Sequence, residues 1–172
     1  MMNNQTNNKA KTLVLASVAM AALSACSTFD CPLSNRVHAS FSLKGEVKTL
    51  SDSLTVSTQR DINNPEEDTV LINRLTDTDS LQLPMSYQRK EDVFYFTLAK
   101  KDTTLVVNDT VWIEKENLPH FESIDCNPAI FHIINGVRFT TNAIDSIVVN
   151  YNKVTYNDAK AHFLIYFKGG TD

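Results

Sequence analysis

The sequence predicts an all-β fold, a single antiparallel β-sandwich of the immunoglobulin-like kind over residues 37–172. Apolar residues recur there with a period of two, which is the period of a half-buried strand. The same region is rich in Val, Ile, Thr, Phe and Tyr, which suit a pleated surface. No segment after Leu23 has the spacing of an amphipathic helix. Short strands at regular intervals favour a sandwich in a chain of 172 residues, with a barrel or a jelly roll as the alternative.

The alternation is clearest near the C-terminus, where Phe163, Ile165 and Phe167 occupy every second position. Leu54 and Val56 repeat the pattern near the start of the domain. Applied along the chain, the pattern predicts strands at residues 37–44, 53–58, 69–74, 80–84, 92–99, 104–107, 110–116, 129–140, 144–150 and 160–168.

An Asp followed by Ser or Thr precedes several of these strands, as at Asp79-Ser80 and Asp109-Thr110. Turn chemistry explains the pattern, because these side chains bond nearby backbone groups and end one element before the next begins. The pattern Asp-Ser/Thr-apolar also resembles the O-glycosylation site of some envelope proteins of gut Gram-negative bacteria. That resemblance implies that Thr69 and Thr110 carry glycan.

Residues 1–25 have the parts of a secretory signal peptide. Lys9 and Lys11 give a basic start, an apolar run from Thr12 to Leu23 follows, and small residues end at Ala25. As a helix the run would extend about 18 Å, well short of the roughly 30 Å hydrocarbon core of a bilayer. We therefore expect a cleavable signal. An ordinary signal peptide followed by a chance Cys and an N-terminal membrane helix are the alternatives.

The cleavage site reads Leu23-Ser24-Ala25-Cys26 and resembles the lipobox of bacterial lipoproteins. The resemblance implies that Cys26 is lipidated and becomes the first mature residue. Several acyl chains hold a protein firmly, whereas one binds only marginally. Ser27 follows the lipid Cys in place of Asp, which by resemblance to known sorting signals implies the outer membrane and the periplasmic side. Residues 26–36 would then be a lipidated N-terminus and short tether.

Cys31 and Cys126 remain once Cys26 is lipidated. An even pair in an oxidising compartment favours one disulfide, which would close a loop of 95 residues. Two separate thiols or a metal-binding pair are the alternatives. A bridge at Cys31 lies five residues from the lipid, at most about 18 Å of extended chain. The folded domain should therefore stay close to its membrane.

The charge balance limits the possible partners. Residues 1–25 carry two lysines and no acid, so their removal changes the net charge from −4 to −6. No basic tract remains, which disfavours a nucleic-acid partner. The acids are dispersed, as on a solvated surface.

Residues 117–128 hold two prolines and Cys126, which predicts a rigid loop or edge segment. His120, Glu122 and Asp125 in this segment offer a binding surface, and together a metal or acid–base set. Their spacing lacks a second ligand pair, so a structural corner is the alternative. Trp112 lies on the more polar face of its strand, where it marks a binding surface or completes the core.

Motifs for catalysis and cofactor binding are missing from the sequence. No Gly-x-Ser-x-Gly nucleophile motif occurs, and four glycines in the whole chain give no phosphate-binding loop. No Cys-x-x-Cys or Cys/His spacing supports zinc. We therefore expect no catalytic residues, no metal and no cofactor.

Several segments resemble a family of small, uncharacterised lipoproteins of gut Gram-negative bacteria. They are Asp30-Cys31-Pro32, Asp109-Thr110-Val111-Trp112, Pro119-His120-Phe121-Glu122-Ser123 with Cys126, Thr141-Asn142-Ala143-Ile144-Asp145-Ser146 and His162-Phe163-Leu164-Ile165-Tyr166-Phe167. The resemblance covers nearly all of the mature chain. It implies one lipoprotein domain and supplies no activity.

These observations predict a membrane-anchored envelope lipoprotein that serves as a non-enzymatic binding module for a protein or glycan partner. A metal-assisted enzyme that uses His120, Glu122 and Asp125 is one alternative, and a purely structural envelope component is another.

Overall fold

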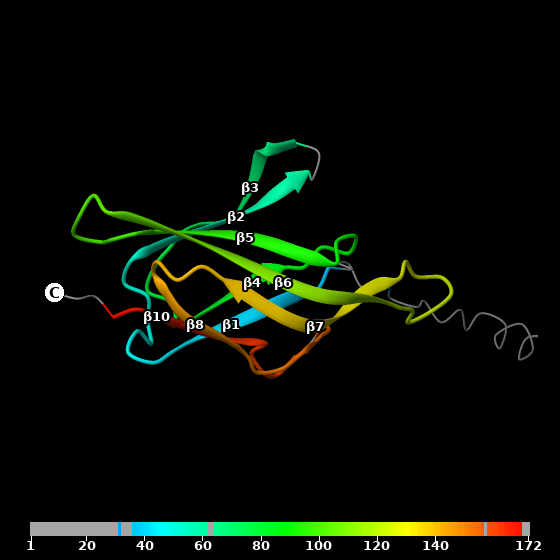
Figure 1. Cartoon of the computed structure of the whole chain (residues 1–172). Coiled ribbons are helices and arrows are strands. Elements are labelled where there is room, and N and C mark those ends of the chain that lie inside the picture. The colour runs from blue at the N-terminus through cyan, green and yellow to red at the C-terminus, as the bar shows by residue number, and fades with distance from the viewer. Residues whose placement is uncertain (1–30, 32–35, 62–63, 157, 170–172) are drawn as a thin grey trace, which may run out of the picture. The chain divides into compact units, whose positions relative to one another are not determined.

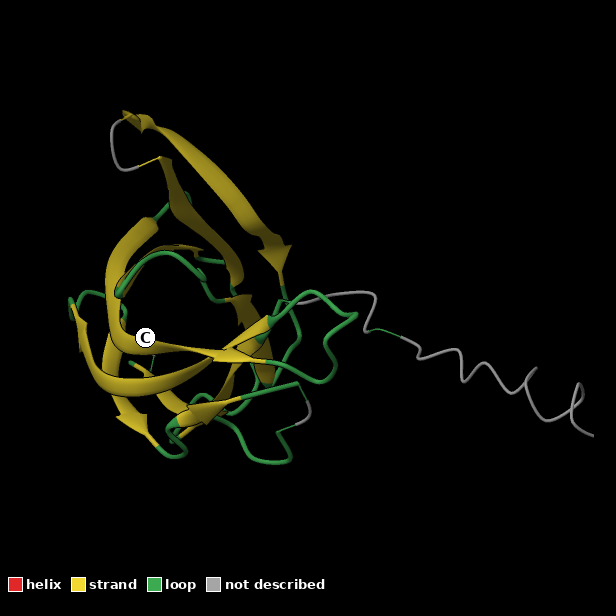
Figure 2. Ribbon diagram, turned by 90° about the vertical axis from the view of Figure 1, so that its right-hand side faces the viewer, coloured by secondary structure: helices red, strands yellow, loops and turns green. Residues whose placement is uncertain are grey.

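The computed structural model describes residues 31, 36–61, 64–156 and 158–169. The chain divides into two units, Met1–Pro32 and Leu33–Asp172. The description below concerns the second unit, whose regular elements are all strands in the described residues (Figure 2). The predicted signal peptide, the lipidation site at Cys26 and most of the predicted tether lie outside the described residues.

Within the described residues, ten strands follow one another, and Figure 1 shows their arrangement. They are β1 (His38–Lys44), β2 (Ser53–Asp61), β3 (Asn64–Leu75), β4 (Ser80–Pro84), β5 (Glu91–Ala99), β6 (Val106–His120), β7 (Ala129–Phe139), β8 (Ile144–Val149), β9 (Lys153–Val154) and β10 (Phe163–Phe167).

The strands form two sheets. One has the order β4-β1-β10-β8 and the other the order β3-β2-β5-β6-β7-β9. The all-β prediction is confirmed. The prediction of a purely antiparallel sandwich is wrong at one place, because β1 and β10 pair in parallel, with Phe41 opposite Phe163. The other strand pairs described are antiparallel.

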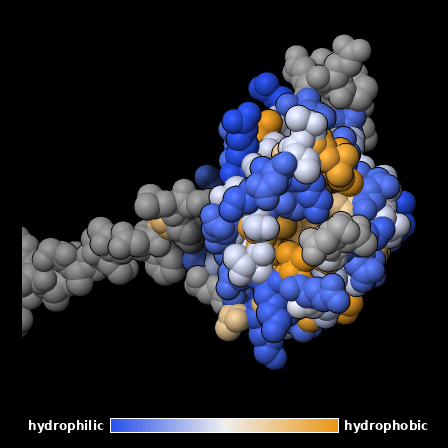
Figure 3. Space-filling model, turned by 90° about the vertical axis from the view of Figure 1, so that its left-hand side faces the viewer, coloured by the Kyte–Doolittle hydropathy of each residue, from blue (hydrophilic) through white to orange (hydrophobic). Residues whose placement is uncertain are grey.

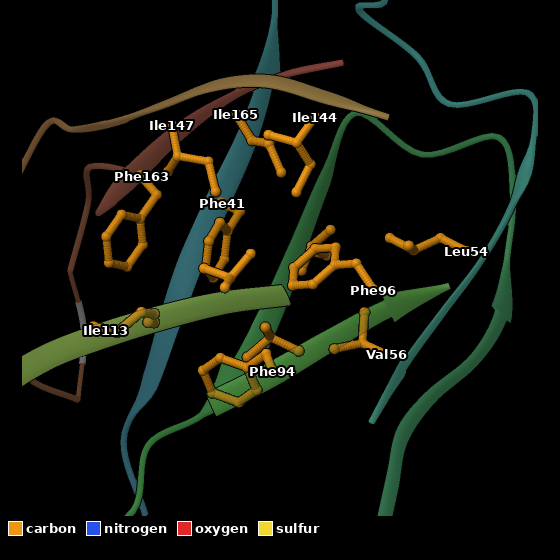
Figure 4. Close-up of a cluster of buried hydrophobic side chains, with 14 of the residues drawn as sticks. Phe41, Leu54, Val56, Phe94, Phe96, Ile113, Ile144, Ile147, Phe163 and Ile165 are labelled. Carbon is orange, nitrogen blue, oxygen red and sulfur yellow. The ribbon is translucent and has the colours of Figure 1, made fainter. Parts of the chain in front are cut away.

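The core lies between the two sheets (Figure 4). Phe41 of β1 stacks on Phe163 of β10, with ring centroids 4.6 Å apart. Phe96 of β5, in the other sheet, meets the Phe41 ring edge-on at 6.3 Å. The alternation in β5 gives an inner row that is almost fully buried, as the sequence pattern predicts. Burial of such aromatic and aliphatic side chains is the main stabilising contribution to a domain of this size.

A buried carboxylate in β6 organises the turn between β7 and β8. Asp109 is 3% exposed. Its two oxygens accept hydrogen bonds from the Thr140 hydroxyl (2.6 Å) and from the backbone N–H groups of Asn142, Ala143 and Ile144 (2.8, 2.6 and 2.9 Å). Burial acts to raise the pKa of Asp109, but these bonds outweigh it and hold the pKa below its ordinary value.

The position of Asp109 shows that the predicted strand boundaries near it are wrong. The predicted strands 104–107 and 110–116 are one continuous strand, β6, and Asp109 lies inside it rather than in a turn. Asp68-Thr69 likewise lies within β3. The turn preference of Asp is a local tendency, and at residue 109 it is overridden because the carboxylate finds its donors 31 to 35 residues away.

Candidate functional site

The inner rows of three strands change from apolar to charged at one end of the sandwich. Inward positions on β5 run from Phe94 to Asp92, and those on β6 run from Ile113 to Lys115. On β2 the corresponding row runs from buried Val56 through half-buried Thr58 to Arg60, which is exposed at the end of the strand. Asp92 and Lys115 are only 3% and 2% exposed. Charged residues are almost never buried to this degree without a partner.

Asp92 and Lys115 form a buried ion pair, with the Lys115 Nζ 3.4 Å from the Asp92 Oδ2. Burial raises the pKa of Asp92, although Lys115 and the Ser86 N–H act in the opposite direction. Burial likewise lowers the pKa of Lys115, although Asp92 opposes it. Desolvation therefore dominates on both sides, and the pair by itself is a weak source of stability.

The pair extends into a hydrogen-bonded network across β6 and β7. The Asn117 Oδ1 accepts from the Lys115 Nζ at 3.1 Å and from the His132 Nδ1 at 2.8 Å. Because a carbonyl oxygen only accepts, His132 Nδ1 carries the proton. His132 is 2% exposed. Burial, reinforced by the charge of Lys115, lowers the pKa of His132 to about 4.

This network holds the loop between β4 and β5 by its backbone. Lys115 Nζ donates to the carbonyl of Ser86 at 2.6 Å and to that of Arg89. Asn117 Nδ2 donates to the carbonyls of Tyr87 (3.2 Å) and Arg89 (3.0 Å). The Ser86 N–H in turn donates to the Asp92 Oδ2 at 3.1 Å. The buried polar groups thus fix the path of residues 86–89.

That loop forms one wall of a cleft of about 300 Å³, called here the arginine cleft. Three arginines are among the residues that line it, namely Arg36, Arg60 and Arg89. Tyr87, which is 57% exposed, stands at its border. Among the described residues, Asp92 is the only carboxylate in the lining. The remainder of the lining mixes apolar and uncharged polar side chains: Thr58, Gln59, Thr69, Leu71, Pro84, Met85, Ser86, Gln88 and Phe94.

A second polar cluster has the composition of a Ser-His-Asp triad. His162 lies with its Nδ1 2.9 Å from the Ser40 Oγ and its Nε2 3.0 Å from the Asp158 Oδ2. The Ser40 backbone N–H also points at Nδ1, at 2.9 Å. A backbone N–H only donates, so Nδ1 is the acceptor and the ring is neutral with its proton on Nε2.

This geometry favours a structural role for His162 over a catalytic one. A serine nucleophile requires an imidazole nitrogen that takes up the hydroxyl proton. The His162 nitrogen next to the Ser40 hydroxyl is Nδ1, and it already accepts a hydrogen bond from the Ser40 backbone N–H. It is therefore not available to take up the hydroxyl proton. The ring, 1% exposed, instead joins β1 to the segment before β10, and its Nε2 also reaches the Lys153 carbonyl at 3.0 Å.

A third concavity, of about 630 Å³, lies at the other end of β5, beside the turn to β6. Leu105, Val107 and Ala143 contribute apolar surface to it. Figure 3 looks onto this end and shows apolar surface inside a border of hydrophilic side chains. Lys100 of the lining is paired with Asp52 at 3.0 Å. The exposed turn at residues 101–105 is held by Asp52, whose Oδ1 accepts from the Lys101 N–H at 3.1 Å.

The predicted binding residues lie apart from these clefts. His120 is exposed and stacks on Phe131, with ring centroids 4.2 Å apart. Glu122 and Asp125 are exposed in the turn between β6 and β7. Burial, and then the charge of Glu122, raise the pKa of Tyr156. Among the described residues, no three His, Cys, Asp or Glu side chains are grouped to hold a metal ion.

Trp112 lies on the outer face of its sheet and is half-buried. The guanidinium of Arg138, opposite it on β7, covers the ring at 5.1 Å from the centroid and also binds Glu91 at 2.7 Å. Trp112 therefore takes part in a surface cation–π contact rather than in the core or in a cleft.

The remaining predicted residues are placed as follows. Thr69 is exposed on β3 and lines the arginine cleft, whereas Thr110 is half-buried in β6. Cys31 and Cys126 are both disulfide-bonded, which confirms the predicted bridge. The described residues include no helix long and apolar enough to cross a membrane.

Sequence analysis missed Arg60, Arg89, Asp92 and Lys115. One signal was available for Asp92 and Lys115: the period of two that places Phe94 and Ile113 in the core continues onto them. Hydropathy alone assigns such residues to solvent, although the alternation places them inside.

Fold and site together define a class: an all-β domain of two packed sheets with a cleft at one end whose wall is fixed by buried charges. The chain belongs to a family of unknown function (DUF6452), which it matches over residues 53–167. The matched segment runs from β2 to β10, so β1 precedes it. No curated protein and no solved structure matches the chain.

Proposed function

We propose that this protein is a non-enzymatic binding module of the bacterial envelope, and that the arginine cleft is its binding site. Lipid on Cys26, after removal of residues 1–25, would anchor it in the outer membrane, facing the periplasm. The lipobox-like run at residues 23–26 supports the anchor. Two packed sheets around a shared core support an immunoglobulin-like sandwich, which commonly presents binding loops at its ends.

The observation that carries the proposal is that the buried charges of Asp92 and Lys115 hold the backbone of the cleft wall. Lys115 donates to the backbone carbonyls of Ser86 and Arg89, and Asp92 accepts from the Ser86 N–H, so both charges hold the loop that forms the cleft wall. A loop held in one conformation loses less entropy when a ligand binds, so this arrangement favours recognition. A concave surface with arginines and an exposed tyrosine has the composition of a binding hot spot.

The anchor can be tested by metabolic labelling with an alkyne-bearing fatty acid, followed by detergent phase separation. We expect label and detergent partitioning in the wild type, and neither in Cys26→Ala. Wild-type protein that stays in the aqueous phase with residues 1–25 attached would refute the anchor.

Binding can be tested by crosslinking intact envelopes and purifying the protein under denaturing conditions. Tyr87→Ala is the test variant, and Phe121→Ala is the matched control, because these aromatic residues are 57% and 66% exposed. We expect a specific partner that is lost with Tyr87→Ala and kept with Phe121→Ala. Recovery of no specific partner, or equal recovery with both variants, would contradict the proposal.

Glycosylation is a second proposal. The Asp-Thr-apolar pattern supports it at Thr69 and Thr110, and exposure favours Thr69 over the half-buried Thr110. Intact-mass measurement of native protein should show added hexose-type mass that Thr69→Val removes. A mass of polypeptide plus lipid alone would end this proposal.

A further inference from the structure

We propose that the tip of the hairpin formed by β6 and β7 lies on the membrane that holds the lipid anchor, with Phe121 and Ile124 among the lipid headgroups. The partner of this surface is therefore a lipid bilayer. The contact would add a second attachment to the lipid on Cys26, and it rests on the anchor proposed above. It does not depend on what the arginine cleft binds.

Residues 118–126, called here the hairpin tip, carry a group of exposed apolar side chains. Leu118, Phe121 and Ile124 occur at every third position and are 37%, 66% and 100% exposed. They are three of the eight large apolar side chains that are exposed in the described residues. Exposed apolar side chains gathered in one place mark contact sites for proteins or membranes.

The hairpin tip is braced by contacts on both of its sides. The pairing of β6 with β7 continues as far as His120, which lies opposite Ala129. The His120 ring stacks on Phe131, with ring centroids 4.2 Å apart. Within the tip, the Cys126 N–H donates to the Ser123 carbonyl at 3.3 Å. A braced loop loses little entropy when its side chains make a contact, which favours binding through the tip.

The disulfide brings the hairpin tip close to the lipid anchor. Bridged cysteines such as Cys31 and Cys126 have Cα atoms about 4.4–6.8 Å apart. Five residues lead from Cys26 to Cys31, which is at most about 18 Å of extended chain. The lipid-bearing residue is thus within about 25 Å of Cys126, two positions after Ile124. Exposed Leu105, by contrast, precedes the start of β6, a strand of 15 residues that is roughly 45 Å long.

The short tether makes a weak contact sufficient. A few apolar side chains bind a bilayer only weakly by themselves. On a short tether the contact is intramolecular, and its effective concentration is in the millimolar range. The carboxylates of Glu122 and Asp125 are exposed in the same tip, and their burial in hydrocarbon would be costly. The tip should therefore stay at the level of the headgroups, and anionic lipid should weaken the contact.

The test uses the lipidated protein, reconstituted in phosphatidylcholine vesicles, with tryptophan as a fluorescent probe of depth. Trp112→Phe removes the emission of the one native tryptophan. In that background, Phe121→Trp and Ile124→Trp each place a probe in the hairpin tip. Leu105→Trp is the matched control, because Leu105 is also apolar and exposed. We expect emission at shorter wavelength, and quenching by lipid brominated near the headgroup end of its acyl chains, for the two tip probes and not for the control.

Further substitutions test whether apolar burial drives the contact. In the Ile124→Trp chain, Phe121→Ser should lower the ratio of membrane-bound to free tip about tenfold, because partial burial of one phenylalanine side chain changes a partition constant by that order. Leu105→Ser in the same chain should leave quenching unchanged. Vesicles of phosphatidylcholine and phosphatidylglycerol in equal parts should reduce quenching, since the exposed carboxylates are repelled. Circular dichroism shows whether each variant is folded.

The outcomes separate the tip contact from the anchor. Absent quenching in the tip, or equal quenching at Leu105, would overturn the contact. A shift in emission without quenching by brominated lipid would mean that protein, such as a second copy of this chain, covers the tip, and quenching that rises with phosphatidylglycerol would favour electrostatic attraction; either result would overturn it. Lipid label on Cys26 without quenching would remove the tip contact and leave the anchor, whereas an unlabelled Cys26 would remove both. Because the lipid attaches the protein by itself, Phe121→Ala is expected to stay in the membrane and to keep a partner bound at the arginine cleft.

Discussion

Acidification from pH 7 to pH 5 is expected to destabilise the domain through His132. This ring is 2% exposed, and burial and the charge of Lys115 lower its pKa from 6.5 to about 4. As the pH falls, the unfolded chain takes up a proton on this histidine before the folded chain does. The stabilising contribution of neutral His132 is therefore complete above pH 6.5 and is lost as the pH falls toward about 4.

The size of the effect follows from the two pKa values. With 6.5 in the unfolded chain and about 4 in the folded one, linkage gives a loss of about 2 kcal/mol between pH 7 and pH 5. The full difference, reached below pH 4, is about 3 kcal/mol. A raised pKa at Asp92 works in the opposite direction, because the folded carboxyl binds a proton more readily.

The assay is urea unfolding of the wild type and of His132→Asn at a series of pH values. Asparagine places a donor near the position of Nδ1 and does not titrate, so the Asn117 hydrogen bond is kept. The contribution of Asp92 is common to both proteins and cancels in the difference. We expect the wild type to lose about 2 kcal/mol more than His132→Asn between pH 7 and pH 5. Parallel losses in the two proteins would refute the reasoning. His38→Asn, at the exposed start of β1, controls for the removal of a histidine.

Three further predictions concern stability, each measured by denaturant unfolding at pH 7. Asp109→Asn should cost about 2–4 kcal/mol, because an amide cannot accept all four hydrogen bonds, whereas exposed Asp145→Asn should change little; equal effects would contradict the role given to Asp109. Gly45→Ala should cost about 1–3 kcal/mol, since its φ is 82° and a Cβ would lie 2.9 Å from a tyrosine ring, while Gly136→Ala, with nothing within 4 Å, should be tolerated. Cys126→Ser should cost about 4–5 kcal/mol in the chain-entropy account, and reduction of the wild type should produce the same loss; an unchanged midpoint in reductant would refute it.

Much of the fold follows from local sequence, because strand alternation is a short-range signal. Phe163, Ile165 and Phe167 lie on one buried face as predicted, and β4 has the predicted bounds of residues 80–84. The parallel pairing of β1 with β10 carries no such signal. It joins residues such as Ser40 and His162, which are 122 positions apart, and no turn sequence connects them.

The candidate site was harder to predict, because its residues contradict their own hydropathy. The hydropathy of Lys115 and Asp92 predicts that they face solvent, yet both are buried and paired with each other. Lys115 also bonds to backbone carbonyls of a loop that lies 26 to 29 residues away in the sequence. His120, Glu122 and Asp125 looked promising because they are close in sequence. In the structure they are exposed at the end of β6 and in the turn that follows it, outside the clefts described above.

The buried pair of Asp92 and Lys115 is better explained by positioning than by stability. Removing Lys115 alone should cost about 3–5 kcal/mol, because it leaves a buried carboxylate without its partner. Replacing both, as Asp92→Leu with Lys115→Met, should leave stability within about 1–2 kcal/mol of the wild type, since apolar groups of similar volume avoid the desolvation cost. The Ser86 N–H would nevertheless lose its acceptor at Asp92, and its amide hydrogen should exchange faster in the double variant while amides of the β5–β6 ladder keep their rates. A double variant that is as stable as the wild type but has a mobile loop at residues 86–89 would show that the pair orders the cleft wall. Unchanged exchange at Ser86 would contradict this, and an equally destabilised double variant would mean that the pair is kept for stability after all.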